Sequence, residues 1–284
     1  MTIAANFLPR NTRAPLPPIA FIGGGNMASA IIGGLLQQGA SAGAFEVVEP
    51  FDEARARLAS DFAITAQAQA SAALSRCAVV VWAVKPQTFA DAARPVRPFV
   101  ADALHLSVAA GIPSDSIARW LGTERIVRAM PNTPALVGQG MTGLFARPAA
   151  AGDRALVEQV LAPTGQLLWV GTESALDAVT AVSGSGPAYV FYFIEAMIEA
   201  GVEMGLPPEQ AHRLALGTFT GASALAASAS EPPAVLRQRV TSKGGTTYAA
   251  ITALEAAQVK ATFKAAIRAA QVRAGELAVE FGEG

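Results

Sequence analysis

The stretch Ile19-Ala-Phe-Ile-Gly23-Gly24-Gly25-Asn26-Met27-Ala28 decides the fold of this chain. A short apolar run, a glycine turn and the start of a helical pattern follow one another, and Gly23, Gly25 and Ala28 have the spacing G-x-G-x-x-[GA]. Glycine lets the backbone approach a pyrophosphate closely, and the amides and dipole at the helix N-terminus would meet its charge. The pattern predicts a dinucleotide-binding turn, although a purely structural glycine turn can look the same.

From residue 18 onward, short apolar runs alternate with longer helical patterns, which is typical of βαβ units around a parallel sheet. The run at 78–84 is apolar on both faces, as a central strand covered by helices requires. We expect strands at 18–23, 45–49, 62–65, 78–84, 103–108 and 125–129, with amphipathic helices such as Met27–Gln38, Asp52–Ser60 and Thr88–Val96 between them.

The strand signals stop near residue 172, and glycine and proline then separate long alanine-rich helical patterns. The sequence therefore predicts an α/β protein with an N-terminal Rossmann-type parallel sheet domain, followed by an all-helical domain. We place a flexible tail at 1–17, the dinucleotide-binding domain at 18–172 and the helical domain at 173–284. Helices are expected at about 186–204, 208–229, 232–240, 246–256 and 258–280.

Composition excludes several classes of function. The chain has 21 Lys and Arg residues and 22 Asp and Glu residues, so its net charge gives no overall attraction to nucleic acid or to an anionic membrane. One cysteine, Cys77, and two histidines leave a structural zinc site without ligands, and we expect no metal. Because 52% of the residues are hydrophobic, a monomer would leave much apolar surface exposed to solvent, and this favours a large subunit interface.

The first 18 residues lack the continuous apolar run of a secretory signal, because prolines interrupt it. No later run approaches the roughly 20 apolar residues of a membrane span. We therefore expect a cytoplasmic protein that does not associate with membranes.

Glu49 follows the second expected strand, where an acidic residue can hydrogen-bond the adenosine ribose and repel a 2′-phosphate. This position favours NADH over NADPH. Arg55 and Arg57 lie nearby and could instead reach a phosphate, and Glu49 could also be an ordinary solvated charge. The cofactor preference therefore stays open between NADPH and NADH.

Other segments should reach the same edge of the sheet. Ala83-Val-Lys85-Pro86-Gln follows the 78–84 strand, at the carboxyl edge where doubly wound folds bind ligands. Ser107-Val-Ala109-Ala-Gly111 and Met130-Pro-Asn-Thr-Pro134 close two more strands. Lys85 could equally be a surface charge, and Pro86 an ordinary helix starter.

In the second domain, Ser183-Gly-Ser-Gly-Pro-Ala-Tyr189 and Val240-Thr-Ser-Lys-Gly-Gly-Thr-Thr-Tyr248 each precede a helix. Small residues permit close approach of backbone or ligand. The second turn would present free amides and a positive dipole end to an anion such as a carboxylate. An ordinary threonine-capped helix after a glycine turn is the alternative.

Together these segments resemble the pyrroline-5-carboxylate reductase family, from about residue 19 to residue 255. The resemblance depends on five motifs in the family's order, and the Val240–Tyr248 segment is the most diagnostic. It implies NAD(P)H-dependent reduction of 1-pyrroline-5-carboxylate to L-proline, and a helical domain that forms a homodimer with the active site at its interface. Dimers could assemble further.

The resemblance also implies roles for individual residues. Lys243 stands where many members have proline, so it either contacts the substrate carboxylate or points to solvent. The implied cofactor contacts are Ile22, Gly23, Gly24, Gly25, Asn26, Met27, Ala83, Val84, Lys85 and Pro86, to which we add Glu49, Ala109 and Gly111 from their positions after strands. The implied substrate contacts are Ser242, Gly245, Thr246 and Thr247, to which we add Gly244 from the same turn.

Reduction of a C=N bond needs a protonated ring nitrogen. We assign Thr247 as the catalytic residue that hydrogen-bonds and orients this nitrogen, while solvent or the protonated imine supplies the proton. His105 and His212 fall beside no motif, so we interpret them as structural or surface residues.

Two other functions fit parts of the sequence. A hydroxyacid or imine dehydrogenase would share the first domain, but it would use a catalytic lysine or similar base that does not stand out here. A non-catalytic dinucleotide-binding regulatory protein would need only the first motif. The intact Ser183–Tyr189 and Val240–Tyr248 segments argue against it.

Overall fold

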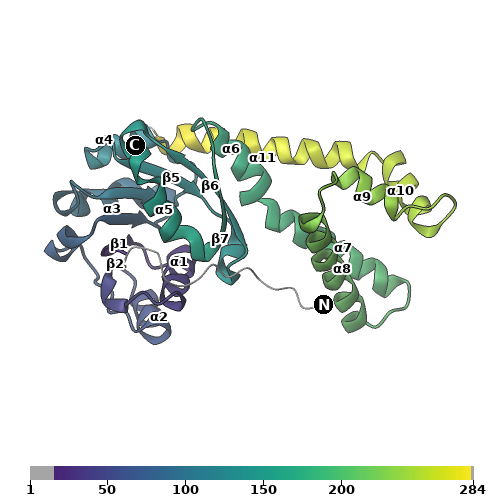
Figure 1. Ribbon diagram of the computed structural model, residues 1–284, viewed down its shortest axis with the longest axis horizontal. Coiled ribbons are helices and arrows are strands. Elements are labelled where there is room, and N and C mark those ends of the chain that lie inside the picture. The colour runs from purple at the N-terminus through teal and green to yellow at the C-terminus, as the bar shows by residue number, and fades with distance from the viewer. Residues whose placement is uncertain (1–15, 283–284) are drawn as a thin grey trace. The chain divides into compact units, whose positions relative to one another are not determined.

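The computed structural model describes residues 16–282 of the chain (Figure 1). The tail expected at 1–17 therefore lies almost entirely outside the described residues. The chain divides into two compact units. The first comprises residues up to Val179 together with those from Gly275 onward, and the second comprises Thr180–Ala274.

The first unit is built around a seven-stranded sheet in the order β2-β1-β3-β4-β5-β6-β7. The strands from β2 to β5 are parallel, β6 runs antiparallel to β5, and β7 is parallel to β6. The predicted Rossmann-type sheet is thus confirmed, with one reversed strand. The strands are β1 (Ile19–Ile22), β2 (Phe45–Val48), β3 (Val79–Trp82), β4 (Leu104–Ser107), β5 (Ile126–Met130), β6 (Gly140–Ala146) and β7 (Gly165–Trp169).

Helices cover both faces of this sheet, and each face has its own apolar core. Successive residues of β1 and β3 alternate between the two cores, so every side chain of β3 is buried. The apolar run at 78–84 is therefore the central strand that its composition predicts. The helices of this unit are α1 (Asn26–Gln37), α2 (Asp52–Phe62), α3 (Phe89–Val96), α4 (Ser114–Leu121), α5 (Arg154–Leu161) and α6 (Ala175–Val179).

The strand expected at 62–65 is wrong. Helix α2 continues to Phe62 and ends in a left-handed residue, Ala63, with φ of 53°. Ile64 then turns back, and its amide donates to the carbonyl of Leu58. Only Gln67 pairs with the sheet, through an isolated bridge to Val48. The apolar residues here fill the core beneath a loop, so the strand before Lys85 is the third rather than the fourth.

Two strands lie where the sequence predicts none. β6 contains Gly140 and Gly143, and glycine inside a strand usually argues against one. At Gly143 the reason is close packing, because a methyl group there would lie 2.6 Å from Cγ1 of Val179. β7 begins at Gly165 and forms the edge of the sheet.

The second unit consists of helices, as predicted, and their bounds fall within a few residues of the expected ones. A single π-helical turn, η8 (Thr180–Gly184), precedes them and was not predicted. The helices are α7 (Gly186–Glu203), α8 (Pro208–Ser228), α9 (Pro233–Arg239), α10 (Thr246–Ala256) and α11 (Val259–Gly282), whose last turns belong to the first unit.

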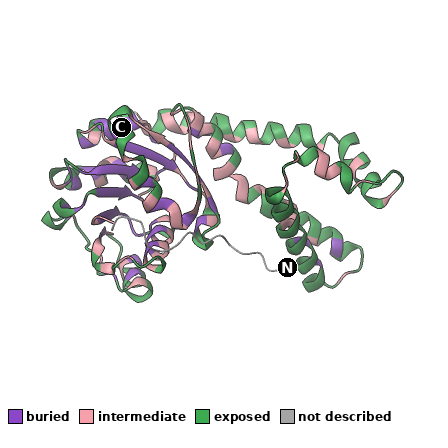
Figure 2. Ribbon diagram, in the orientation of Figure 1, coloured by how far each residue is buried: buried purple, intermediate pink, exposed green. Residues whose placement is uncertain are grey.

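Burial differs sharply between the units (Figure 2). Strands β1, β3 and β4 of the first unit are wholly buried, whereas the edge strand β7 has no buried residue. Among the described residues of the second unit, the buried ones are small: Ala181, Gly201, Ala211, Ala215 and Ala274. The helical unit has therefore not formed a conventional apolar core from one chain.

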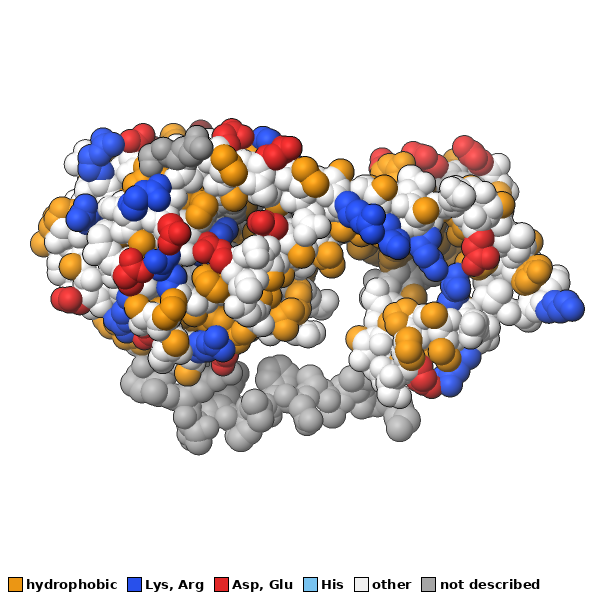
Figure 3. Space-filling view, turned by 90° about the horizontal axis from the view of Figure 1, so that it is seen from above, with side chains coloured by type: hydrophobic (Ala, Val, Ile, Leu, Met, Phe, Trp, Pro, Cys, Tyr) orange, Lys and Arg blue, Asp and Glu red, His pale blue; other side chains and the backbone are white. Residues whose placement is uncertain are grey.

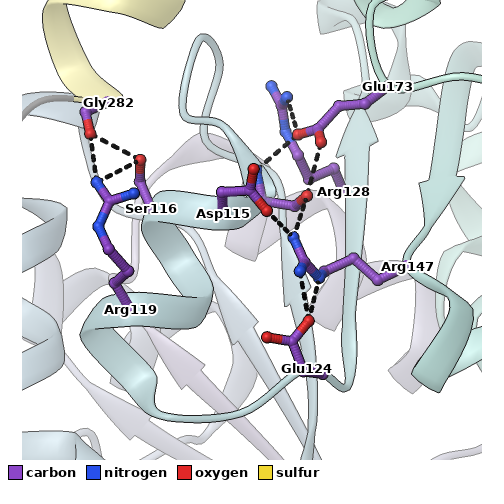
Figure 4. A network of polar contacts seen from close by, with 9 residues as sticks. Asp115, Ser116, Arg119, Glu124, Arg128, Arg147, Glu173 and Gly282 are labelled. Atoms are coloured by element: carbon purple, nitrogen blue, oxygen red, sulfur yellow. Dashed lines mark hydrogen bonds and ion pairs between the residues drawn. The ribbon is translucent and has the colours of Figure 1, made fainter.

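A polar network in the first unit ties its elements together (Figure 4). Glu173 accepts hydrogen bonds from the amide and hydroxyl of Ser114, both at 2.6 Å, at the N-terminus of α4. It also pairs at 2.6 Å with Arg128 of β5, whose side chain is 9% exposed. Arg119 of α4 donates to the carbonyl of Gly282 at the end of α11. The contacts form two clusters on α4, of which one connects α4 to β5 through Glu173 and the other connects α4 to the last turn of α11.

Candidate active site

The glycine turn connects the end of β1 to the start of α1. Gly23 has a φ of 96°, and a methyl group there would lie 2.5 Å from the carbonyl oxygen of Ala83. The turn therefore packs directly on the backbone that follows β3. Gly25 caps α1, is exposed, and has nothing within 4 Å of the position of a side chain. This open space at a helix N-terminus fits a pyrophosphate, so the residues present suit a dinucleotide.

Glu49 fixes this turn from the end of β2. Its side chain is inside the protein, with the residue 5% exposed. One carboxylate oxygen accepts a hydrogen bond of 2.7 Å from the amide of Gly24, and the other accepts one of 2.9 Å from the amide of Phe51. Hydrogen bonds to a charged acceptor are strong, so the carboxylate holds the glycine turn and the start of α2 together. This structural role was not visible in the sequence.

The guanidinium of Arg55 already has hydrogen-bond and ion-pair partners. It donates to the carbonyls of Glu49, at 2.9 Å, and Pro50, at 2.8 Å, and it forms an ion pair with Asp52. Arg57 is exposed on the same helix. Of the two arginines considered for a 2′-phosphate, Arg55 would have to give up these partners first.

The segment Ala83–Pro86 lies beside the glycine turn. The amide of Ala83 donates to the carbonyl of Ile22 at 2.8 Å, which links the ends of β3 and β1. Pro86 begins a short 3-10 helix, and the amide and hydroxyl of Thr88 both donate to the carbonyl of Lys85. The side chain of Lys85 is exposed. The structure thus brings these two predicted cofactor segments together.

The next two strand ends differ from each other. Ala109 follows β4 and is buried, and its amide donates to the hydroxyl of Ser107. Gly111 has a φ of 73°, and a methyl group there would lie 3.2 Å from Cβ of Leu277 in α11. The open side of Gly111 is therefore covered by α11. After β5, the 3-10 helix Thr133–Val137 packs against α1, as expected for a segment near the glycine turn.

In the second unit, the predicted substrate residues form one turn before α10. Gly244 has a φ of 77°, and the amide of Gly245 donates to the carbonyl of Ser242 at 3.1 Å. Gly245 caps α10, whose first two residues are Thr246 and Thr247. Ser242, Thr246 and Thr247 are exposed. The turn presents hydroxyls and a helix N-terminus, a combination that can bind a carboxylate.

The Ser183–Tyr189 segment begins in the last two residues of the π-helical turn and continues into α7. The amide of Ser185 donates to the carbonyl of Thr180 at 2.8 Å, and the hydroxyl of Tyr189 donates to the carbonyl of Ala181 at 3.1 Å. π-Helical turns are often found at functional sites. The small residues of the motif made such a turn possible, but they do not by themselves identify it.

The two histidines have different surroundings. His105 is buried in β4, whereas His212 is exposed on α8. Nδ1 of His105 accepts a hydrogen bond of 3.0 Å from the Trp82 indole, and Nε2 lies 3.2 Å from the carbonyl oxygen of Val100. Burial, with a smaller contribution from the charge of Arg125, lowers the pKa of His105 to about 4. Cys77 is also buried, and burial raises the pKa of its thiol to about 11.

Residues 16–282 contain no group of three or more His, Cys, Asp or Glu side chains placed to hold a metal ion. They also contain no helix with both the length and the apolar character needed to cross a bilayer.

The sheet and the glycine turn define a dinucleotide-binding domain, and the comparisons with known proteins make the chain an NAD(P)-dependent oxidoreductase. Residues 18–111 match the family described as "NADP oxidoreductase coenzyme F420-dependent", and residues 173–277 match "Pyrroline-5-carboxylate reductase dimerisation". The pyrroline-5-carboxylate reductase of Pseudomonas aeruginosa is 45% identical over 270 residues, which cover 94% of this chain and 99% of the relative. The chain belongs to the pyrroline-5-carboxylate reductase family.

Solved structures agree with this assignment. A pyrroline-5-carboxylate reductase from Coxiella burnetii superposes with a TM-score of 0.85 at 36% identity, covering 92% of this chain and 98% of the other. The Plasmodium falciparum pyrroline carboxylate reductase with NADP bound has a TM-score of 0.82 at 27% identity, with the same two coverages.

Proposed function

We propose that this protein reduces 1-pyrroline-5-carboxylate to L-proline with NADH or NADPH. The observation that supports the proposal is the presence, in one chain of this family, of two separate turns in which a glycine precedes a helix N-terminus. One is the glycine turn at α1, and the other is the Ser242–Thr247 turn at α10. We assign residues 18–172 to cofactor binding and residues 173–284 to dimerisation and substrate binding.

The first turn would hold the dinucleotide. The amides at the start of α1 face the open space at Gly25, and Ala83–Pro86 lie alongside. When bound, the nicotinamide cofactor supplies the hydride that the C=N carbon receives. Glu49 is held at the ribose end of the turn, and Arg55 is occupied by Asp52 and two carbonyls. These contacts favour NADH over NADPH, because Glu49 is an anion and the guanidinium of Arg55 already has three partners. The exposed Arg57 is the arginine of α2 that would have to bind a 2′-phosphate.

The second turn would hold the substrate. The amides at the N-terminus of α10 and the hydroxyls of Ser242 and Thr246 would bind the carboxylate. The Thr247 hydroxyl would hydrogen-bond the ring nitrogen and orient the imine, which takes its proton from solvent or is bound already protonated. Thr247 then acts by position, because a hydroxyl is a weak acid.

The assembly would be a homodimer with the active site at its interface. Support comes from the second unit, where Phe191 is 64% and Tyr192 is 69% exposed in the single chain. Large apolar side chains exposed together mark an interaction surface. The cytoplasm is the location that we propose for this enzyme.

A kinetic comparison tests the role of Thr247. With NADH and pyrroline-5-carboxylate, Thr247→Ala should lower kcat/KM by roughly 10²-fold, because an orienting hydrogen bond is lost, while the Kd for NADH stays nearly unchanged. Cofactor oxidation is followed by absorbance, and Kd by fluorescence titration. Comparing NADH with NADPH in the same assay measures the preference attributed to Glu49 and Arg55.

Thr252→Ala is the matched control. Thr252 is exposed on the same helix, and its hydroxyl donates to the carbonyl of Tyr248 at 2.8 Å. This variant should keep the parent activity. An equal loss of NADH affinity in Thr247→Ala would reject the substrate role, and a folded parent that binds NADH but turns over nothing would reject the proposed reaction.

A further inference from the structure

Three glutamates form an acidic stripe along α7. Glu195, Glu199 and Glu203 are exposed and four residues apart. Residues at this spacing lie on one face of a helix, so the stripe is about 12 Å long at the helical rise of about 1.5 Å per residue. Phe191 and Val202, at 64% and 40% exposure, flank it.

This acidic stripe faces away from the packing within the unit. Phe193 lies two residues before Glu195 and therefore on the opposite side of α7, where its ring contacts Phe263 of α11 at 5.4 Å between centroids. Gly201 of α7 packs against Ala211 of α8, which is a third direction around the helix. Neither neighbouring helix of the same chain covers the glutamates.

A basic stripe of the same length runs along α11. Its members are the exposed Lys260, Lys264 and Arg268, again four residues apart. Figure 3 shows that Lys and Arg side chains gather in a row over the helical part of the chain. Val272 follows four residues later and is 62% exposed. Phe263, which faces α7 of its own chain, is offset from Lys264 by about 100° around the helix.

Each stripe is unfavourable by itself. Like charges four residues apart destabilise a helix, and each stripe contains two such pairs in succession. Within residues 16–282 none of the six side chains forms an ion pair, whereas Arg237 and Arg239 of the same unit pair with Glu255 and Glu231. The stripes therefore lack within one chain the opposite charges that would relieve their repulsion.

We propose that the acidic stripe of α7 in one copy docks on the basic stripe of α11 in a second copy. This inference rests on the homodimer proposed above and names the surface that makes it. The two stripes have the same length and spacing and carry opposite charges. Exposed apolar side chains border both of them. The region that matches the dimerisation family, residues 173–277, contains both helices.

Twofold symmetry makes the contact occur twice. In an isologous dimer, α7 of each copy meets α11 of the other, so the six charged side chains of each copy all gain partners. Complementary charge at an interface selects the partner and fixes its register. The stripes would therefore specify which helices pair, while the apolar residues beside them supply most of the buried surface.

Reciprocal charge reversal tests the proposal. One variant carries Glu195→Lys, Glu199→Lys and Glu203→Lys, and the other carries Lys260→Glu, Lys264→Glu and Arg268→Glu. Each alone would place like charges opposite each other at both contacts, so its dimer Kd should rise by about tenfold or more. Mixed, the two variants should form heterodimers as tightly as the parent forms homodimers, because both contacts then have opposite signs. Native mass spectrometry of one tagged and one untagged chain measures this.

Three outcomes are decisive. A monomeric parent would reject the proposed homodimer itself. A dimeric parent whose triple variants dimerise unchanged would overturn only the inference about the stripes, as would a mixture with no preference for heterodimers. The mixing step also distinguishes pairing between chains from pairing within one chain. In each triple variant both stripes carry the same charge, so they attract each other only when they belong to two different variants. The control, Glu209→Lys with Arg213→Glu on α8, alters exposed charges outside the stripes and should dimerise like the parent.

Discussion

Gly23 and Gly25 serve the glycine turn for different physical reasons. Gly23 has a left-handed backbone, and a side chain there would collide with the Ala83 carbonyl. Gly25 has an ordinary extended backbone, with φ of −76°, and faces open space. The fold therefore requires Gly23, whereas we propose that the bound cofactor requires Gly25.

Alanine substitutions separate these two requirements. Gly23→Ala should lower the free energy of unfolding by about 2–4 kcal/mol, because strain and a backbone clash combine. Gly25→Ala should leave it within about 1 kcal/mol, since the backbone suits alanine. Yet Gly25→Ala should raise the Kd for NADH at least about tenfold, because the methyl group occupies the space for pyrophosphate. Urea unfolding and fluorescence titration measure the two effects, and normal NADH binding by Gly25→Ala would contradict this placement.

His105 makes stability depend on pH. Because Nδ1 accepts from Trp82, the neutral ring carries its proton on Nε2 and donates to Val100. Its pKa is about 4 in the folded protein, against an ordinary value of 6.5. The unfolded chain thus binds the proton more readily, so stability is fully present above about pH 6.5 and is lost as pH falls toward 4.

The expected loss from this group between pH 7 and pH 5 is about 2 kcal/mol of unfolding free energy. Urea unfolding of the parent and of His105→Gln at both pH values isolates the contribution of His105 to this loss of unfolding free energy. The variant should be less stable at pH 7, but the difference from the parent should narrow at pH 5. His212→Gln, which changes the exposed histidine, should follow the parent at both pH values. A constant difference between parent and His105→Gln would show that His105 does not titrate as described.

At the scale of elements, sequence patterns predicted best where local signals and packing agree. Pro208, Pro233 and Gly205 stand at helix boundaries of the second unit, so those helices were placed within a few residues. The segment 62–65 failed because its apolar residues fill a core from a loop. The prediction missed β6 because Gly143 permits close packing with Val179, and this contact cannot be seen without the tertiary structure.

The candidate site shows the same division. The glycine turn and the turn before α10 were predictable as turns because glycines directly precede a helical pattern in both segments. The hydrogen bonds of Glu49 with two amides could not be predicted, because they depend on where the end of β2 lies relative to the glycine turn. Gly111 likewise carries no signal that α11, far away in the sequence, covers it.

The Glu173 network should stabilise the first unit measurably. Glu173→Gln removes the charge that pairs with the nearly buried Arg128, so we expect a loss of about 2 kcal/mol, discounted because the Glu173 side chain is 27% exposed. Asp91→Asn is the control, because the Asp91–Arg94 pair is 77% and 80% exposed and should contribute at most about 0.5 kcal/mol. Urea unfolding compares them, and equal losses would argue against a special role for the network.

For the whole molecule, the two units have different sources of stability. The first unit buries a core on each face of its sheet, whereas the second unit leaves large apolar side chains of α7, α8 and α11 exposed. Helices stabilised mainly by tertiary packing need another surface to cover them. Folding of the second unit should therefore be linked to association, and stability should depend on protein concentration.

Serine substitutions at two phenylalanines of similar exposure test whether folding of the helical unit is linked to association. Phe191 on α7 is 64% exposed and Phe51 before α2 is 72% exposed. If a second copy covers only the helical unit, Phe191→Ser should raise the dimer Kd and lower Tm, while Phe51→Ser should leave dimerisation unchanged. For the parent, tenfold dilution should lower Tm by roughly 2–4 °C, because mass action changes stability by about 1.4 kcal/mol. Circular dichroism across a hundredfold concentration range measures Tm, and sedimentation measures association. A Tm independent of concentration, with Phe191→Ser and Phe51→Ser behaving alike, would mean that the helical unit is stable without a partner.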